Sequence, residues 1–242
     1  MTLVVALAGE DDIVVAADSL HSVGFPGNRF RDTSAKKILT SGNYVVGFAG
    51  SPKGICTFQL TEPSFEGKLL QDAGKLSMAM DKMVSVAPSG VQPSRFLLCG
   101  FEKSRPRIYR WEWNGEEIQL NDCNLAPRLM VRDGISAIGQ EGHGGYLMYS
   151  HAYSKNLSLE ERVFLAYLCI HEVAEHDHDV SIPIDVSIVK QGRVIELDRT
   201  KLAGLTKKCV SFRKRLSSEI SRGARGIKLE ELVAANQPNP CM

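Results

Sequence analysis

The sequence lacks the features that mark secreted, membrane-spanning and metal-binding chains. In 242 residues there is no apolar run near the roughly 20 residues that a bilayer span requires. The N-terminal segment has no basic region ahead of its apolar stretch, so we expect no signal peptide. Six cysteines are scattered without a single CxxC pair, which favours reduced thiols in a cytoplasmic protein.

Net charge is also nearly absent, but the small total hides an asymmetry. The chain carries 29 basic and 28 acidic residues, for a formal net charge of +1. Residues 1–198 hold 19 basic and 25 acidic side chains, whereas ten basic residues and one acid, Glu219, lie between Arg199 and Lys228. We therefore expect an acidic domain over residues 1–198 and a basic C-terminal extension over residues 199–242, with helical stretches at 210–220 and 228–235.

The chain is 43% hydrophobic, as folded globular proteins are, and its elements fall in blocks. The order is strands, two helices, strands, two helices, strands, which predicts an α+β core with helices grouped on the faces of sheets. The first two strands are apolar at nearly every position, so both faces of their sheet should be covered. The predicted strands are 3–8, 13–17, 36–40, 44–49, 95–101, 108–113, 117–120, 135–138, 184–190 and 193–197, and the predicted helices are 51–60, 69–86, 144–152 and 159–174.

Two short hairpins near the N-terminus bring polar residues together. In the first, cross-strand partners should have numbers that sum to 21, which places Thr2 and Asp18 at the same end. The second turns over residues 41–43, so that partners sum to 84 and Lys37 lies opposite Gly47. The first hairpin is thus predicted to bring together a hydroxyl and a carboxylate, and the second an ammonium and a glycine amide.

These four groups can make a nucleophilic site. A threonine hydroxyl needs a base, and at a chain terminus the α-amine, with a pKa of about 7.7–8.0, can supply it. Removal of Met1 would place that amine on Thr2. The ammonium of Lys37 would lower the pKa of the amine, Asp18 would fix Lys37, and the Gly47 N–H would hold an oxyanion.

The segments that carry these residues resemble a known family. They read Thr2-Leu-Val-Val-Ala-Leu, Ile-Val-Val-Ala-Ala-Asp18-Ser, Ala-Lys-Lys37-Ile and Val-Val-Gly47-Phe-Ala-Gly-Ser. Together they resemble proteasome β-type subunits, and they are similar to the peptidase ring of the bacterial two-component ATP-dependent protease. The resemblance extends over most of residues 2–197 and is strongest before residue 51.

The resemblance implies a four-layer αββα sandwich of the N-terminal-nucleophile hydrolase type over residues 1–198. It implies a threonine-type endopeptidase that cleaves polypeptides, with Thr2, Asp18 and Lys37 catalytic and Gly47 in the oxyanion hole. Ser22 falls where the family contacts the substrate backbone. No cofactor and no metal are implied. The expected partners are a polypeptide substrate and further copies in a homo-oligomeric ring, single or stacked, and the resemblance allows an ATPase unfoldase as a further partner.

Two positions depart from the family pattern and leave other functions open. Gln140 stands where the family has a serine, and Asp177 is followed by Val180 where a second serine is expected, with Ser181 one step further. Two alternatives therefore remain. One is a ring-forming structural subunit without activity, and the other is a hydrolase of the same fold that acts on small amides.

Two other patterns receive plainer interpretations. The histidines of segment 171–179 lack the i, i+4 spacing of a zincin helix, so we expect no catalytic metal. His176 and His178 alternate with acids, which suits a solvated loop or a contact with a hard cation. The basic extension could bind nucleic acid, but Phe212 is its single aromatic residue. Contact with the acidic body of a neighbouring subunit is the favoured interpretation, and no membrane contact is expected.

Overall fold

The structure of the chain is a computed structural model in which the chain divides into two compact units, Met1–Leu202 and Ala203–Met242. It describes residues 2–25, 28–32, 36–85, 93–113, 129–132 and 134–224, without the side chains of residues 21–25, 28–32, 129, 223 and 224. None of the helices in these ranges is long and apolar enough to cross a membrane.

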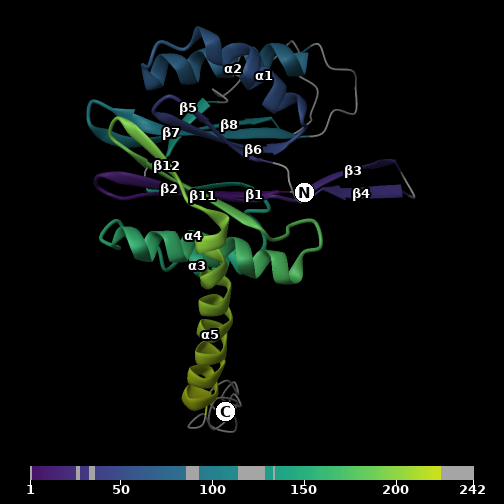
Figure 1. Cartoon of the computed structure of the whole chain (residues 1–242), viewed down its shortest axis with the longest axis vertical. Helices are drawn as coiled ribbons and strands as arrows, with labels where there is room; N and C mark the ends of the chain where they lie inside the picture. The colour runs from purple at the N-terminus through teal and green to yellow at the C-terminus, as the bar shows by residue number, and fades with distance from the viewer. Residues whose placement is uncertain are drawn as a thin grey trace, which may run out of the picture. The chain divides into compact units, whose positions relative to one another are not determined.

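The first unit is an α+β sandwich of four layers (Figure 1), as predicted. Two five-stranded antiparallel sheets face each other, and a pair of helices covers each outer face. One sheet has the order β5 (Ile38–Ser41), β6 (Tyr44–Gly50), β7 (Ser94–Glu102), β8 (Arg105–Trp113), β9 (Leu129–Arg132), and it is covered by α1 (Lys53–Thr61) and α2 (Leu69–Ser85). The other has the order β10 (Ile135–Gly139), β1 (Leu3–Ala8), β2 (Asp12–Asp18), β11 (Ile184–Lys190), β12 (Arg193–Glu196), and it is covered by α3 (Gly144–Ser150) and α4 (Leu159–His176).

The first hairpin has the predicted register. Val4 pairs with Ala17 and Ala8 with Ile13, so that the numbers of the partners sum to 21. Every residue of β1 and β2 is buried, because α4 packs on one face of these strands and the second sheet lies against the other. The side-chain period of two makes such a register costly to shift, which explains why pattern alone predicted it.

The second hairpin differs from its predicted register by one residue. Ser41 pairs with Tyr44 across a two-residue turn, in which Gly42 has a positive φ of 54°. Gly47 therefore lies opposite Ile38 and not opposite Lys37. The sequence analysis assumed a three-residue turn, whereas a glycine that adopts positive φ allows the tighter one.

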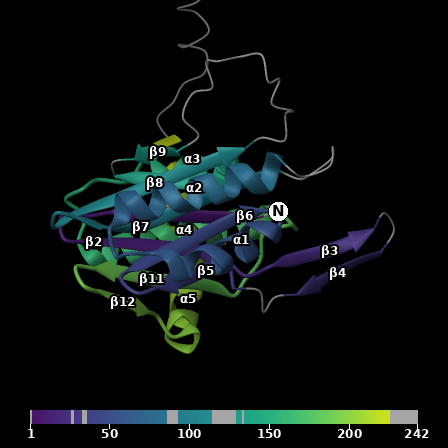
Figure 2. The same cartoon turned by 90° about the horizontal axis from the view of Figure 1, so that it is seen from above.

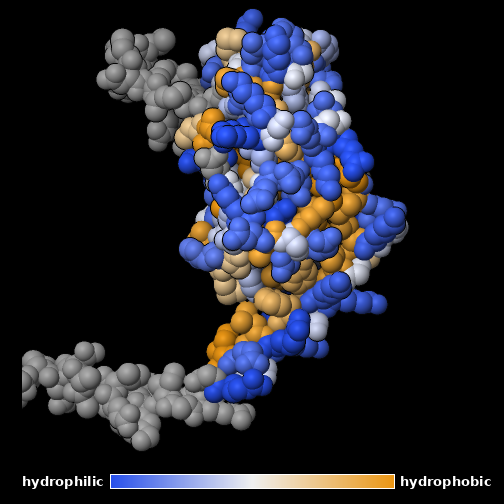
Figure 3. Space-filling model, turned by 90° about the vertical axis from the view of Figure 1, so that its left-hand side faces the viewer, coloured by the Kyte–Doolittle hydropathy of each residue, from blue (hydrophilic) through white to orange (hydrophobic). Residues whose placement is uncertain are grey.

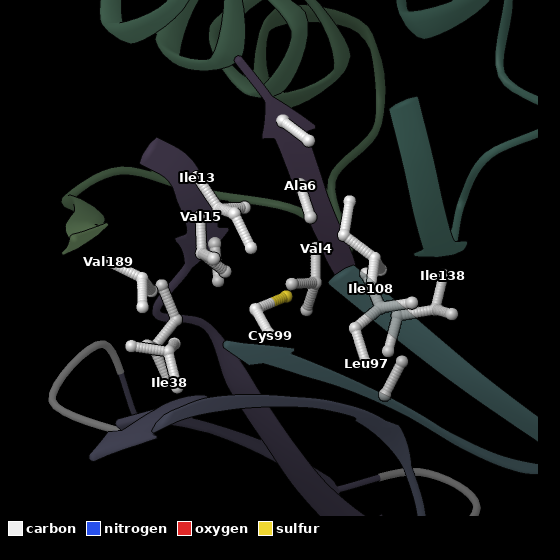
Figure 4. Packing of buried hydrophobic residues seen from close by; sticks show 14 residues of the cluster. Val4, Ala6, Ile13, Val15, Ile38, Leu97, Cys99, Ile108, Ile138 and Val189 are labelled. Atoms are coloured by element: carbon white, nitrogen blue, oxygen red, sulfur yellow. The ribbon is translucent and has the colours of Figure 1, made fainter. Parts of the chain in front are cut away.

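The space between the two sheets is filled by an apolar cluster. Val4 and Ile138 of one sheet meet Leu97 and Ile108 of the other, and all four are fully buried (Figure 4). A second cluster, rich in aromatic side chains, lies between the other face of β6–β8 and helices α1 and α2, and includes the stacked pair Phe96–Trp111. These two layers fix the spacing of the elements that carry the site.

Helix α4 starts as the sequence predicts. Ser158 accepts a hydrogen bond from the Glu161 N–H at 3.2 Å, and Glu161 accepts one from the Ser158 N–H at 2.7 Å, which completes a capping box. One residue further, buried Arg162 forms an ion pair with Asp12 at 2.6 Å. Helix α1 begins one residue later than predicted, with Pro52 and not Ser51 at the N-cap position.

One hairpin was not predicted. Strands β3 (His21–Phe25) and β4 (Asn28–Asp32) form a two-stranded sheet of their own between Asp18 and Lys37 (Figure 2). The predicted strand at 117–120 and the predicted helix at 228–235 lie outside the described residues.

The described part of the second unit is helical. It belongs to α5 (Arg199–Ala224), which is longer than the predicted helical stretch 210–220. Residues 203–224 carry six basic side chains and one acidic side chain, Glu219. The apolar side chains of Val210 and Ile220 are exposed, and Figure 3 shows hydrophobic surface along part of this helix.

Candidate functional site

The peptide group that joins Thr2 to Leu3 is held from both sides. The Thr2 carbonyl oxygen accepts a hydrogen bond from the Gln140 N–H at 2.8 Å, and the Leu3 N–H donates to Asp18 Oδ1 at 2.9 Å. Thr2 itself is buried, with 9% of its surface exposed, at the start of β1. The position of Thr2 is therefore set by β10 on one side and by the end of β2 on the other.

The carboxylate of Asp18 joins this peptide to the predicted lysine. Asp18 is fully buried at the end of β2, and its Oδ2 lies 2.7 Å from Lys37 Nζ. The same oxygen accepts the Leu20 N–H at 3.1 Å. The structure thus brings Thr2, Asp18 and Lys37 together, although Lys37 comes from the segment before β5, in the other sheet. A carboxylate with three donors is held in one orientation.

Burial shifts the titration of both charged groups. It lowers the pKa of the Lys37 ammonium, and the nearby Asp18 carboxylate opposes this effect. Burial also raises the pKa of Asp18, while Lys37 and the two backbone amides act in the opposite direction. Loss of water is therefore the larger influence on each group, and Lys37 gives up its proton more readily than a lysine in solvent does.

Gly139 lets β10 approach Thr2 closely. Its φ is +97°, and a Cβ there would clash with the Thr2 carbonyl oxygen. The same Cβ would lie 3.4 Å from the Ala49 Cβ, so the C-terminal end of β6 lies beside this turn. A glycine is required at position 139 because φ is positive and because a Cβ would clash with the Thr2 carbonyl oxygen.

The structure does not give Gly47 its predicted role. Gly47 lies inside β6, with Ile38 opposite on one side and Leu97 on the other. The Phe48 N–H donates to the Lys37 carbonyl, and successive amides alternate in direction, so the Gly47 N–H faces β7. An amide that is used within a sheet is not free to hold an oxyanion. A Cβ at Gly47 would press on Val4, so the glycine serves the close approach of the two sheets.

A different amide of β6 is better placed. By the same alternation the Gly50 N–H faces the side of β5, but β5 begins only at Ile38 and does not extend that far. Gly50 is exposed, with φ of +101°, and it follows Ala49 beside the Gly139 turn. The sequence signal for it was present in the run Gly47-Phe-Ala-Gly50, but only the register decides between the two glycines.

Gln140, which stands where the resembled family has a serine, contacts Asp177. Gln140 Nε2 donates to Asp177 Oδ2 at 2.8 Å, and the other oxygen of Asp177 accepts the Asp179 N–H at 2.8 Å. Asp177 is the C-cap residue of α4. The backbone N–H of Gln140 therefore contacts Thr2, and the side chain of Gln140 contacts the end of α4.

The remaining predicted residues are less informative. Ser22 lies in β3 opposite Arg31 of β4, and its side chain is outside the described residues, as is Met1. In segment 171–179, His171 is buried in α4, whereas His176 and His178 are exposed. Within the described ranges, no group of three or more His, Cys, Asp or Glu side chains is arranged to hold a metal ion.

Comparison with known proteins supports the fold. No protein-family model matches the chain, and no curated protein matches it in sequence. Among solved structures, it is similar to Anbu from Hyphomicrobium sp. strain MC1, with 17% identity and a TM-score of 0.67 over 89% of this chain and 97% of that one. An Anbu (Gly-1) mutant from the same strain gives a TM-score of 0.68 at 17% identity, over 91% of this chain and 100% of that one.

Likeness at this level of identity establishes the fold and does not assign the chain to the proteasome β-type subunits. The chain has the fold of the proteasome-like N-terminal-nucleophile hydrolases.

Proposed function

We propose that the chain is a threonine-type endopeptidase of the N-terminal-nucleophile class, which cleaves peptide bonds of polypeptides. The observation that carries the proposal is the Asp18 carboxylate, which joins the Leu3 N–H and the Lys37 ammonium at 2.9 and 2.7 Å. Asp18 links the buried Lys37 cation to the peptide group that follows Thr2, which supports a role for the Thr2 hydroxyl as the nucleophile. This role requires that Met1 be removed, so that the α-amine belongs to Thr2.

In the first step the Thr2 hydroxyl attacks the carbonyl carbon of the scissile bond, and the α-amine takes the hydroxyl proton. The ammonium of Lys37 disfavours protonation of the amine at rest, so more of it is available as a base near neutral pH. Asp18 keeps Lys37 in place. The α-amine is then the general base, so no side chain is needed for this role.

The oxyanion that forms needs a donor, and we assign this role to the Gly50 N–H in place of Gly47. Collapse of the tetrahedral intermediate breaks the C–N bond, and the α-ammonium returns its proton to the leaving amine. The product is an ester on Thr2. Water, deprotonated by the same amine, then hydrolyses the ester and restores the hydroxyl. Ser22 is proposed to contact the substrate backbone.

We further propose a homo-oligomeric ring, single or stacked, with an ATPase unfoldase as a partner. Charge supports the assembly: residues 203–224 carry six basic side chains and one acid, whereas residues 1–198 carry six more acids than bases. Sedimentation of the full chain should show an oligomer at low salt that dissociates as salt is raised. A monomer at low salt would contradict the ring.

The test is covalent labelling of Thr2. Purified protein is incubated with a β-lactone, which acylates an activated hydroxyl, and the adduct is located by intact-mass and peptide mass spectrometry. We expect an adduct on Thr2 of a chain without Met1, and none in Thr2→Ala. A chain that retains Met1, or that forms no adduct, would sink the peptidase proposal and favour the structural subunit. Hydrolysis of small amides without hydrolysis of unfolded casein would favour the amidase.

A further inference from the structure

Four charged side chains form a network between the two sheets near Thr2. Arg95 lies on β7, Arg110 and Glu112 lie on β8, and Glu141 follows β10. Their side chains are largely buried, between 14% and 26% exposed. Arg110 Nη2 contacts Glu112 Oε2 at 2.5 Å and Glu141 Oε1 at 2.8 Å. Arg95 approaches Glu112 Oε1 with Nε at 3.1 Å and Glu141 Oε2 with Nη1 at 3.5 Å.

Both arginines also donate to backbone carbonyls of β10. Arg95 Nη1 donates to the Gly139 oxygen at 3.2 Å, and Arg110 Nη1 donates to the Ala137 oxygen at 2.9 Å. Strand β10 is the edge strand of its sheet and pairs only with β1 in that sheet order. Alternate carbonyls of an edge strand face away from the sheet, and these two are taken by guanidinium groups from the opposite sheet.

The contact of Arg95 reaches Thr2 through a single peptide group. The Gly139 carbonyl, which accepts from Arg95, and the Gln140 N–H, which donates to the Thr2 carbonyl at 2.8 Å, belong to the same peptide. A cationic donor on the carbonyl polarises this peptide and strengthens the hydrogen bond on its other side. It also fixes the plane of the peptide, and therefore the direction of the Gln140 N–H.

We propose that Arg95 is a positioning residue for the nucleophile, with Arg110 and the two glutamates holding it in place. The inference rests on the proposed function of Thr2 and adds to it a residue on the opposite sheet. Lysine could replace the charge of Arg95 but not its rigid, planar guanidinium. The Nη1 of this group donates to the Gly139 carbonyl and to Glu141, while its Nε forms an ion pair with Glu112. Nucleophiles are sensitive to such support, since a displacement of about 1 Å can cost about 100-fold in rate.

The experiment measures how fast the β-lactone acylates Thr2 in the full chain, separated into the binding constant of the lactone and the maximal rate of acylation. For Arg95→Ala we expect a maximal rate about 10- to 100-fold lower, with the binding constant almost unchanged. Arg95→Lys should recover part of the loss. A rate within about twofold of the wild-type value in folded Arg95→Ala would overturn the inference.

Arg162→Lys is the matched control. Arg162 is also a buried arginine that combines a carboxylate, Asp12, with a backbone carbonyl, Leu157, but it lies at the other end of β2. We expect this variant to lose stability and to keep the acylation rate. If Arg95→Lys and Arg162→Lys slowed the acylation of Thr2 equally, Arg95 would be a general structural residue and the positioning role would be wrong.

Hydrogen exchange separates this inference from the proposed function. In Arg95→Ala, peptides that cover residues 137–143 should exchange about tenfold faster than in the wild type, since the Gln140 N–H loses its support. Peptides that cover the Arg162 contact should not change. If wild-type protein formed no adduct, the peptidase proposal would fail, and unchanged exchange in Arg95→Ala would overturn the positioning role by itself.

Discussion

Strand β2 begins and ends with an aspartate, and each one forms a buried ion pair with a different cation. At its first residue, Asp12 pairs with Arg162 at 2.6 Å, and at its last residue, Asp18 pairs with Lys37 at 2.7 Å. The side chains of both cations are about equally buried, 5% and 6% exposed. The two pairs match in distance and in the burial of the cation, although the Asp18 side chain is 0% exposed and that of Asp12 is 10% exposed. They differ most in the chemistry of the cation.

Arginine keeps its proton at any pH at which the protein is folded, whereas a buried lysine can lose it. At the first end the guanidinium joins α4 to the turn between β1 and β2, which is a structural task. At the second end the pKa of Lys37 is lowered by burial, and its carboxylate partner also holds the Thr2–Leu3 peptide. We infer that the first pair fixes the fold and that the second prepares chemistry.

The largest effect should come from making the second pair like the first. In Lys37→Arg the positive charge stays, but the larger, planar group does not fit the position of Nζ beside Asp18. We expect acylation of Thr2 to fall by about 1000-fold or more, as when a catalytic group is removed. Stopped incubations followed by mass spectrometry measure the rate. A variant that keeps a tenth of the wild-type rate would contradict a specific role of lysine.

Breaking the first pair should instead cost stability. Arg162→Ala leaves the carboxylate of Asp12 buried without its cation, a change that typically costs about 3–5 kcal/mol. Urea unfolding followed by circular dichroism measures this loss. At a temperature where the variant is folded, we expect its Thr2 acylation rate to be within about twofold of the wild-type rate. A large loss of rate in the folded variant would remove the contrast between the two ends.

A pair of glycines offers a finer comparison. A Cβ at Gly139 would meet the backbone carbonyl of Thr2, whereas one at Gly9 would meet the guanidinium of Arg162, at the far end of a flexible side chain. We expect Gly139→Ala to slow acylation by about 100-fold, since Thr2 is displaced. Gly9→Ala should cost about 1 kcal/mol of stability and leave the rate unchanged. Rates and unfolding midpoints of both variants test this, and equal rates would contradict it.

The smallest expected effect concerns pH. The acylation rate should rise as the α-amine loses its proton, near or below pH 8, and should fall again when Lys37 loses its own. Because the pKa of Lys37 is lowered from 10.5, the falling limb should lie below that pH. Arg162 keeps its proton over this range of pH, so it causes no fall in the acylation rate. A rate that stays constant up to pH 10.5, in protein that is shown to be folded there, would argue against a protonated Lys37 in the active form.

Local pattern predicted the α+β class and the first hairpin, whereas the four layers were implied by the family resemblance. Continuous apolar runs mark strands that are covered on both faces, and period two fixes the register of Val4 and Ala17. The second hairpin was shifted by one residue because Gly42 accepts a positive φ. In the observed register the Gly47 N–H faces β7 and the Gly50 N–H faces the side of β5, so we propose Gly50 as the oxyanion donor where the sequence analysis expected Gly47.

The supporting residues of the site could not be predicted in the same way. Gln140 and Asp177 are 37 residues apart, and Arg95 and Gly139 are 44 apart. Neither pair has a local motif, since the contacts arise only when β7, β10 and α4 are packed around Thr2. Arg95 in the sequence is one of many arginines, and only its distance to the Gly139 carbonyl distinguishes it.

The apolar layer between the sheets has a mechanical consequence. Arg95 lies in one sheet, and Lys37 comes just before a strand of that sheet, whereas Asp18 and Gly139 lie in the other sheet. Side chains such as Leu97 and Ile108 lie between the two sheets (Figure 4). That layer acts as a spacer whose thickness sets the gap across which the polar contacts form. A slightly thinner or looser layer would put the site out of alignment while the protein remained folded. The proposed reactivity of Thr2 is therefore more sensitive than the fold to the distance between the sheets.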